Sequence, residues 1–342
     1  MKKVLVGISG GVDSAVSALL LKQQGYEVVG ATMILFGDIE SNQSIEDAKK
    51  VCKQLNIEHH IIDLMDTFKE KVINSFIKSY KDGETPNPCI ECNRFLKFGA
   101  LFEKGKELGC EYIATGHYAK VNNGMLFKAD DEKKDQTYFL YKIEKKVLPY
   151  IIFPLENLDK EIIRKIAKDN NLIVADKKDS QEICFIPNDD YANYLESNLS
   201  TLPDAGDFVL KDGTLLGKHK GIIYYTIGQR KGLGISYKIP LYVIEINKQN
   251  NTIVLGEEKD LYNNILIATD VNLLVDLLPK EVMAKVRYRS KISKAQIEII
   301  DNNNVKVVFE EPQRSITKGQ SVVFYDNDIC LGGGIIKEII TK

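Results

Sequence analysis

The chain has 342 residues, 44% hydrophobic and 27% charged, with a formal net charge of −2. This composition is typical of a globular protein, and a length prior of about 150 residues per domain suggests two or three domains. No apolar run approaches the ~20 residues of a membrane span, and no signal-peptide cleavage site follows the N-terminus. We therefore expect a cytoplasmic protein with no membrane partner. The balanced charge means that a nucleic-acid partner would have to bind to local patches.

The first predicted element is a buried parallel strand over the apolar run Val4–Ile8. It leads into the sequence S-G-G-V-D-S (residues 9–14). After it, apolar residues recur at helical spacing, and we expect the helix to end at Gly25. The two glycines allow a tight turn and a close approach to a ligand, and the helix N-terminus offers N–H groups to an anion. Asp13 is suited to Mg²⁺. Alternatively, Asp13 or Ser14 simply caps the helix.

This six-residue stretch after the first strand resembles the pyrophosphate-binding loop of the PP-loop ATPases. The resemblance implies splitting of ATP at the α-phosphate, transfer of AMP to an oxygen and release of pyrophosphate. Strands and helices are then expected to alternate, with strands at 27–33, 59–63 and 111–115 and helices at 44–55 and 66–80. The fold class is therefore α/β, with a doubly wound parallel sheet whose ligands bind at the carboxyl ends of the strands.

Two of these strand ends carry candidate ligand contacts. Met33 closes the second strand, where it either lines an adenine pocket or lies in the core. Gly116 follows the fourth strand and would allow a ligand to approach the backbone closely. Its neighbour His117 is either a substrate contact or a loop histidine with internal partners.

Residues 83–93 read G-E-T-P-N-P-C-I-E-C-N. We expect the two prolines to exclude a helix and to hold an extended loop as far as Asn93, with a helix after it. The C-x-x-C of Cys89 and Cys92 is either redox-active or half of a metal site, because cysteines of a cytosolic chain stay reduced. By composition alone, Cys184 reads as a buried small hydrophobe.

The remaining chain is predicted to change character near residue 200. Before it, Lys134-Asp135-Gln136 precede a short helix for which Asp135 is a fair N-cap, and a further helix is expected over Ile162–Asn170. After it, short strands are expected at 206–210, 214–218, 221–225 and 242–246, followed by a small antiparallel barrel from about residue 263. Basic blocks at 211–231 and 280–294 carry interleaved tyrosines, which are typical either of solvated faces or of RNA-binding surfaces.

Six motifs in order make the constellation specific: S-G-G-V-D-S, T-P-N-P-x-x-x-C-N, A-T-G-H-Y, K-D-Q-T-Y-F-L, D-S-Q-E-I-C-F-I and T-I-G-Q-R-K-G-L-G-I. Together they resemble the tRNA-specific 2-thiouridylases over essentially the whole chain. The resemblance implies an ATP-binding PP-loop catalytic domain (1–200), a small, mostly β central domain (201–262) and a C-terminal β-barrel (263–342), the last two binding tRNA. It also implies ATP and Mg²⁺ as cofactors, the anticodon stem-loop of tRNA and a sulfur donor as partners, and we expect a monomer.

The same resemblance assigns residues by motif. Nucleotide contacts are implied for Gly7, Ile8, Ser9, Gly10, Gly11, Val12, Asp13, Ser14, Met33 and Gly116. Contacts with the target base are implied for Asn87, Pro88 and Cys89, and other tRNA contacts for His117, Lys134, Asp135, Gln136, Arg287, Tyr288 and Gln320. Cys92 matches the catalytic nucleophile and Cys184 the persulfide carrier, with a disulfide between them as the product of sulfur release.

Three alternatives stay open. Family members vary at the position of Cys89, many having Asp there, and the third cysteine here would allow Cys89, Cys92 and Cys184 to ligate a [4Fe–4S] cluster. A PP-loop synthetase that adenylates a small molecule would have no evident use for the cysteine loop or the basic barrel. A non-catalytic tRNA-binding sulfur carrier would have no need of an intact residue 9–14 loop.

Overall fold

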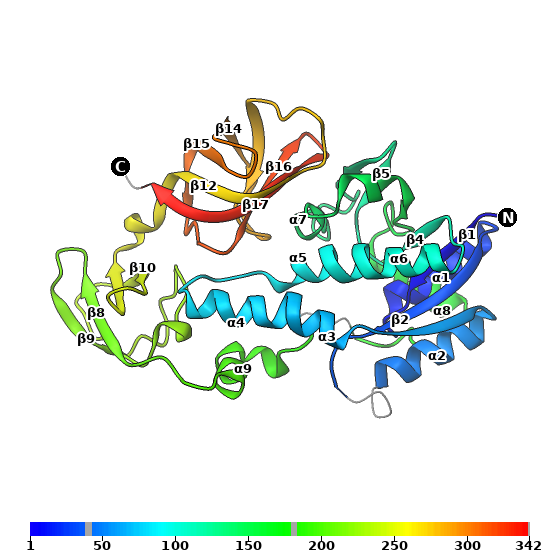
Figure 1. Cartoon of the computed structure of the whole chain (residues 1–342), viewed down its shortest axis with the longest axis horizontal. Helices are drawn as coiled ribbons and strands as arrows, with labels where there is room; N and C mark the ends of the chain where they lie inside the picture. The colour runs from blue at the N-terminus through cyan, green and yellow to red at the C-terminus, as the bar shows by residue number, and fades with distance from the viewer. Residues whose placement is uncertain (38–42, 179–182, 341–342) are drawn as a thin grey trace.

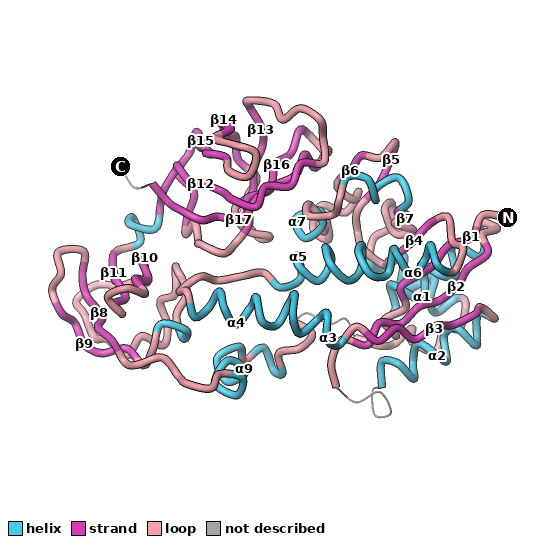
Figure 2. Tube along the Cα trace, in the orientation of Figure 1, coloured by secondary structure: helices cyan, strands magenta, loops and turns pink. Residues whose placement is uncertain are grey.

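The computed structural model describes residues 1–37, 43–178 and 183–340. The first four residues of the predicted D-S-Q-E-I-C-F-I motif lie outside these ranges. Three sheets organise the chain: an N-terminal parallel sheet, a small mixed sheet and a larger antiparallel sheet (Figures 1 and 2). In Figure 1 the parallel sheet lies at the right, the mixed sheet at the left and the antiparallel sheet above. Within the described residues, no helix is both long and apolar enough to cross a membrane.

The parallel sheet confirms the predicted doubly wound fold. Its strand order is β3-β2-β1-β4-β7, so the order reverses between β1 and β4, where such sheets bind ligands. The central strand β1 is buried on both faces, because Val4 and Val6 pack into one apolar cluster and Leu5 into another. The strands are β1 (Lys3–Gly7), β2 (Glu27–Ile34), β3 (Glu58–Asp63), β4 (Tyr112–Ala114) and β7 (Ile151–Ile152).

Helices cover both faces of this sheet. Buried side chains of α1 (Val12–Gln23), α2 (Gln43–Leu55) and α8 (Lys160–Asp169) share the cluster that contains Val4 and Val6. On the Leu5 face, Leu101 and Phe102 of α6 (Leu101–Glu107) complete the second cluster. The helix predicted over 66–80 is one continuous run of α3 (Met65–Phe68), a π-helical turn (Lys69–Ile73) and α4 (Asn74–Lys81).

The prediction of an extended loop as far as Asn93 is wrong for the last residues of that loop. A helix, α5 (Pro88–Cys92), begins inside it and runs on through a π-helical segment (Asn93–Ala100) into α6. Proline is tolerated at the first helical position, because a backbone N–H there would have no acceptor within the helix. Asn87 caps this helix, since its side-chain oxygen accepts a hydrogen bond from the backbone N–H of Cys89 at 3.2 Å. Both cysteines of the C-x-x-C therefore lie on a helix.

Two further local predictions are corrected. Gln136, not Asp135, is the N-cap residue of α7 (Thr137–Leu140), although the Asp135 carboxylate still accepts from the backbone N–H of Thr137 at 3.3 Å. The strand expected at 221–225 is a 3₁₀ turn over Ile222–Tyr224. All three of its residues are buried, so they lack the alternation that a strand with one solvated face shows.

The central region contains a four-stranded mixed sheet in the order β10-β11-β8-β9. Its strands are β8 (Gly206–Leu210), β9 (Leu215–His219), β10 (Tyr242–Asn247) and β11 (Thr252–Gly256). Helix α9 (Tyr191–Asn198) precedes the sheet, and 3₁₀ turns lie at Lys145–Tyr150, Pro187–Asp189 and Glu258–Leu261. One apolar cluster joins this sheet to α4 and to Cys92, so the central region is anchored beside the cysteine helix.

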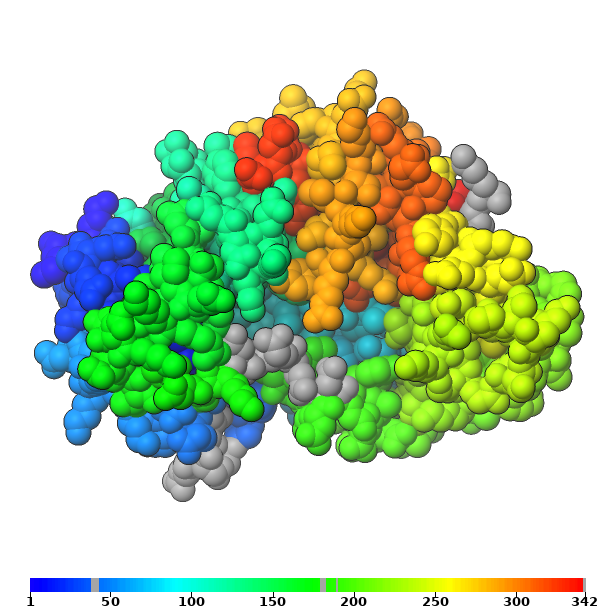
Figure 3. Space-filling model, turned by 180° about the vertical axis from the view of Figure 1, so that it is seen from behind, coloured from blue at the N-terminus to red at the C-terminus, as the bar shows by residue number. Residues whose placement is uncertain are grey.

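The C-terminal barrel closes because β12 pairs with both β15 and β17. Its strands are β12 (Tyr262–Leu273), β13 (Glu281–Lys285), β14 (Ser293–Ile299), β15 (Val305–Arg314), β16 (Ser321–Asp326) and β17 (Ile329–Ile340). A hairpin from the N-terminal half, β5 (Lys120–Asn122) and β6 (Met125–Phe127), extends it by pairing β6 with β17. Hydrogen bonds thus cross between the first and last predicted domains, and Figure 3 shows the orange barrel bordering both the green N-terminal part and the yellow central part.

Candidate active site

The loop after β1 has the geometry of an anion site. Helix α1 begins at Val12 with Gly11 as its N-cap residue and without a side-chain cap, so neither Asp13 nor Ser14 caps it. The Ser14 hydroxyl instead bonds within the loop, donating to the Gly11 carbonyl and accepting from the Ser9 amide, both at 3.1 Å. These bonds fix the turn while the first amides of a 12-residue helix stay without a side-chain acceptor.

The carboxylate of Asp13 lies at the centre of a charged cluster. Lys160, the first residue of α8, donates to its Oδ1 at 2.6 Å, and the Tyr118 hydroxyl donates to the same oxygen at 3.2 Å. A second lysine, Lys177, donates to the Gly10 carbonyl at 2.9 Å and to Asp47 of α2 at 2.8 Å. Two ammonium groups therefore lie against the loop, where they would offset the charge of a polyphosphate.

The loops after β1 and β4 touch at the reversal of strand order. A Cβ added to Gly116 would lie 2.9 Å from the Asp13 backbone carbon and 3.0 Å from the Ser14 nitrogen. Glycine is therefore required at 116 by the first turn of α1 itself. Met33 lies near the carboxyl end of β2 and is part-buried against two apolar clusters, so its side chain is in part a core contact. These residues fit an adenine nucleotide with its phosphates at α1.

Three thiols lie near one another and near Lys97. Cys89 and Cys92 are three residues apart on α5 and so share a helix face, and Cys92 packs in the same apolar cluster as Phe185, next to Cys184. Burial raises the pKa of Cys89 and of Cys92. Burial of the thiol, followed by the charges of Cys92 and Cys89, raises the pKa of Cys184 to about 12. The residue as a whole is exposed, so the buried small hydrophobe expected from composition is wrong. The two thiols expected to handle sulfur thus lie close enough to influence each other.

Lys97 supplies the positive charge of this cluster. It lies five residues after Cys92 in the π-helical segment, about one turn along the same face, and its ammonium offsets part of the rise in pKa that burial causes at all three thiols. The same ammonium donates to His117 Nε2 at 3.3 Å, and His117 Nδ1 bonds to Thr115 Oγ1 at 2.7 Å. Burial, then Lys97, holds the pKa of His117 well below its usual value, so this imidazole is neutral. Lys97 and His117 therefore link the thiols to the end of β4.

The described residues provide no group of three or more Cys, His, Asp or Glu side chains that could hold a metal ion. All six cysteines fall within the described ranges, and each is a free thiol. In this arrangement Cys89, Cys92 and Cys184 do not form a ligand set for a [4Fe–4S] cluster, and the expected Cys92–Cys184 disulfide is not formed.

Several residues predicted to contact tRNA have internal partners here. Asp135 is buried and accepts from Thr137 Oγ1 at 2.7 Å, and the Gln136 side chain accepts from the Tyr118 amide at 2.9 Å. Lys134, beside them, is part-exposed. Asp135 and Gln136 therefore position the β4 loop, whereas Lys133 and Lys134 keep exposed surface.

The barrel residues of the prediction lie at contacts with other parts of the chain. Arg287 donates to the Ile227 carbonyl at 3.1 Å and also to the Thr317 hydroxyl, and burial lowers its pKa. Tyr288 packs on Phe139 with 4.5 Å between ring centroids. Gln320 donates to the Thr85 carbonyl at 2.8 Å. These three residues thus join the barrel to the central region, to α7 and to the loop before α5.

Sequence reasoning missed three lysines of the site, Lys97, Lys160 and Lys177, although they are plain in the printed sequence. Lys160 and Lys177 act on groups distant along the chain; Lys160, for example, is 147 residues from Asp13. Only for Lys97 does a local signal exist, since it lies at helical spacing after the C-x-x-C. The other two are indistinguishable from surface lysines until the chain folds.

Comparison with known proteins identifies the family. Three family models match in succession: "tRNA methyl transferase HUP domain" over residues 2–188, "tRNA methyl transferase PRC-barrel domain" over 192–257 and "Aminomethyltransferase beta-barrel domain" over 263–336. A solved structure, a 4-thiouridine synthetase–RNA complex with bound ATP, is 18% identical with a TM-score of 0.38, covering 57% of this chain and 50% of that one, which is too distant to carry an argument.

Curated relatives match over nearly their whole length. The tRNA-specific 2-thiouridylase MnmA of Clostridioides difficile is 48% identical over 355 residues, covering 98% of both chains. The protein of the same name from Clostridium beijerinckii is 49% identical over 356 residues, covering 99% of both. With this identity over its full length, and with the three domain models in order, the chain belongs to the tRNA-specific 2-thiouridylase family.

Proposed function

We propose that this chain uses ATP to replace the C2 oxygen of the wobble uridine of tRNA with sulfur, releasing AMP and pyrophosphate. The observation that carries the proposal is the convergence of two unlike sites. An anion-binding loop on α1 and a cluster of thiols on α5 meet through Lys97 and His117 at the point where the strand order reverses. A small-molecule synthetase would need the first site, but it would have no use for the second.

The first step is activation of a poor leaving group. The uridine C2 oxygen attacks the α-phosphorus of ATP, the bond to the β-phosphate breaks, pyrophosphate leaves, and the base gives up its N3 proton. The amides of α1 bind the phosphates, and Lys160 and Lys177 offset the charge that develops. Asp13 would hold Mg²⁺, which would supply further positive charge to the phosphates.

The second step delivers sulfur. With a persulfide on Cys184, the Cys92 thiolate attacks the inner sulfur, a Cys92–Cys184 disulfide forms and hydrosulfide leaves. Hydrosulfide then adds to C2, the C2–oxygen bond breaks, AMP leaves, and the sulfur-borne proton returns to the base. A thiol reductant restores the two cysteines by supplying two electrons. Lys97 stabilises the anionic sulfurs in this sequence because it is the cation that acts on all three thiols.

The cluster alternative would use Cys89, Cys92 and Cys184 as ligands. Because these thiols do not converge as a ligand set here, the cluster would require them to rearrange. Anaerobic purification followed by iron and sulfide assays separates the schemes. A colourless, iron-free and fully active protein excludes the cluster, whereas activity that follows iron content excludes the persulfide scheme.

The decisive experiment analyses the product. Unmodified tRNA is incubated with the protein, ATP, a thiol reductant and a persulfide or sulfide source, then digested to nucleosides for mass spectrometry. We expect 2-thiouridine to appear only with ATP, together with AMP formation that tRNA stimulates. Binding of tRNA without ATP turnover would support the non-catalytic sulfur carrier, and ATP turnover indifferent to tRNA would support the small-molecule synthetase.

A further inference from the structure

The segment from Glu84 to Arg94, here called the strap, carries the predicted base-contacting residues and Cys92. At its first end it is tied to the barrel by three contacts. The Thr85 amide donates to the Lys318 carbonyl at 2.9 Å, Gln320 donates to the Thr85 carbonyl at 2.8 Å, and Lys337 pairs with Glu84 at 3.1 Å. Backbone contact is close here, since a Cβ on Gly319 would lie 3.0 Å from the Thr85 nitrogen.

At its second end the strap is tied to the barrel by charge. Asp270 of β12 accepts from Arg94 at 3.3 Å and from Lys142 at 2.6 Å, and Lys142 also donates to Glu91 at 2.7 Å. The Lys142 side chain is only 1% exposed, so its ammonium depends on these two carboxylates. Glu91 and Arg94 flank Cys92, so this ionic chain ends on either side of the reactive thiol.

Lys142 is itself held in place by the barrel. The amide nitrogen of Asn272, two residues after Asp270 on β12, donates to the carbonyls of Tyr141 and Ile143 at 2.7 and 2.9 Å. The residues on both sides of Lys142 are therefore fixed to the strand that also carries its carboxylate partner. A shift of β12 would move Lys142 and, through Glu91, the cysteine helix.

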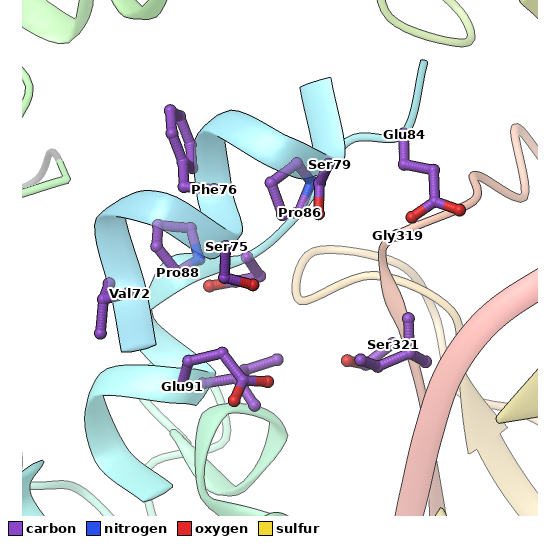
Figure 4. Close-up of a pocket in the computed structure, with 13 residues that line it drawn as sticks. Val72, Ser75, Phe76, Ser79, Glu84, Pro86, Pro88, Glu91, Gly319 and Ser321 are labelled. Atoms are coloured by element: carbon purple, nitrogen blue, oxygen red, sulfur yellow. The ribbon is translucent and has the colours of Figure 1, made fainter. Parts of the chain in front are cut away.

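Between its two ends the strap borders both the core, where Ile90 is 2% and Cys92 8% exposed, and an unfilled space. A cavity of about 80 Å³ lies between the strap, α4 and the barrel, and its lining includes Asn87 and Pro88. Figure 4 shows Ser75 and Glu91 on one side of this hollow and Gly319 and Ser321 on the other. The strap is thus tied to the barrel at both ends, packs Ile90 and Cys92 into the core, and has free volume beside Asn87 and Pro88 that would accommodate a shift of its anchors.

We propose that the strap couples the C-terminal barrel to Cys92, with Lys142 and Asp270 as positioning residues, so that tRNA seated on the barrel sets the geometry of the sulfur-transfer step. This inference rests on the proposed function, because tRNA is its effector. It goes further in giving the barrel a role in positioning the reactive thiol in addition to binding.

The test variant is Asp270→Asn. Its backbone is preserved, because Asp270 has φ +49° and asparagine adopts that region readily, while the charge that binds Lys142 and Arg94 is removed. The matched control is Asp276→Asn, since Asp276 also joins the barrel to the N-terminal part, through Lys145 at 2.5 Å, without touching the strap. Lys142→Arg serves as the conservative variant that keeps the ionic chain.

Steady-state thiolation of a tRNA transcript gives the first readout. We expect Asp270→Asn to lower kcat at least about tenfold while the tRNA Kd and the ATP KM stay within about twofold. Asp276→Asn and Lys142→Arg should keep kcat within about threefold of the wild-type value. Equal losses for Asp270→Asn and Asp276→Asn, or a loss for Asp270→Asn that appears entirely in the tRNA Kd, would overturn the proposal.

Hydrogen–deuterium exchange of peptides spanning 84–94 gives a readout that needs no turnover. Without ligand, exchange there should be faster in Asp270→Asn than in Asp276→Asn, and tRNA should slow it in the control alone. Unchanged exchange in Asp270→Asn would refute the coupling. If exchange behaves as expected but the unmodified protein makes no 2-thiouridine, the proposed function fails and the mechanical coupling stands.

Discussion

Replacing Gly10 with alanine tests how tightly the PP-loop is packed. Gly10 has φ +71°, and an alanine Cβ there would lie 2.3 Å from the Ser44 carbonyl oxygen at the start of α2. The left-handed conformation costs a residue with a Cβ about 1–2 kcal/mol. Pushing back a backbone carbonyl costs about 1–3 kcal/mol, as overpacking does. We therefore expect Gly10→Ala to lower the free energy of unfolding by about 2–5 kcal/mol.

Gly11→Ala is the matched control in the same loop. Gly11 has an extended backbone with φ −105°, and its nearest neighbour to an added Cβ is the Ser9 hydroxyl oxygen at 3.4 Å, an ordinary contact. Alanine restricts the unfolded chain at such a position, so this variant should gain up to about 1 kcal/mol. Its Cβ could still obstruct ATP, which is why the comparison uses protein without nucleotide.

Urea unfolding measures the difference. Far-UV circular dichroism and tyrosine fluorescence report the transition, since the chain has no tryptophan. With a slope of about 3 kcal/mol per molar urea, Gly10→Ala should lower the midpoint by roughly 0.7–1.7 M. Equal midpoints and slopes for the two variants would refute the packing of the loop against α2.

Three further outcomes are expected. Cys92→Ser and Cys184→Ser should each abolish thiolation while AMP formation persists in part, and robust 2-thiouridine from either variant would reject the role of that thiol. Lys97→Met should raise the pKa of Cys92, so that its alkylation rate rises only at higher pH, whereas Lys97→Arg should keep the original profile; identical profiles for all three proteins would exclude this electrostatic role. Burial and Lys97 depress the pKa of His117 in the folded protein, so below about pH 6.5 the unfolded state binds one proton more than the folded state. The free energy of unfolding therefore decreases as pH falls through that range. His117→Gln should reduce that loss in urea midpoints between pH 7.5 and 5.5, and an unchanged slope against pH would contradict a buried neutral imidazole.

The predictions that the structure confirmed are those with a strong local cause. The β1–loop–α1 unit follows from an apolar run, two glycines and a change of period within 25 residues. The errors arise where a local rule had a positional exception. Pro88 excludes a helix interior but not a helix start, and the consecutive buried residues at 222–224 removed the alternation of a strand.

The roles predicted for individual residues show the same division. Gly116 was expected to admit a ligand, and the structure adds that Asp13 and Ser14 leave no room there for a Cβ. Asp135 and Gln136 were expected at the tRNA surface, yet both side chains bond within the protein. A motif identifies a position as constrained, but it does not say whether the constraint comes from the substrate or from a neighbouring strand.

The sequence by itself determined the parallel fold and the strand, Gly-rich loop and helix at its start, because these depend on periodicity and glycine conformation within short stretches. Only the tertiary structure decided which charges surround this loop and the candidate thiols. Lys97 reaches His117, Lys160 reaches Asp13, and Lys142 joins Glu91 to Asp270, which lie 51 and 128 residues from it along the chain. The strength of an electrostatic interaction depends on the distance between the charges and on their burial. Neither quantity can be read from the order of residues, because both are set by how the strands and helices pack.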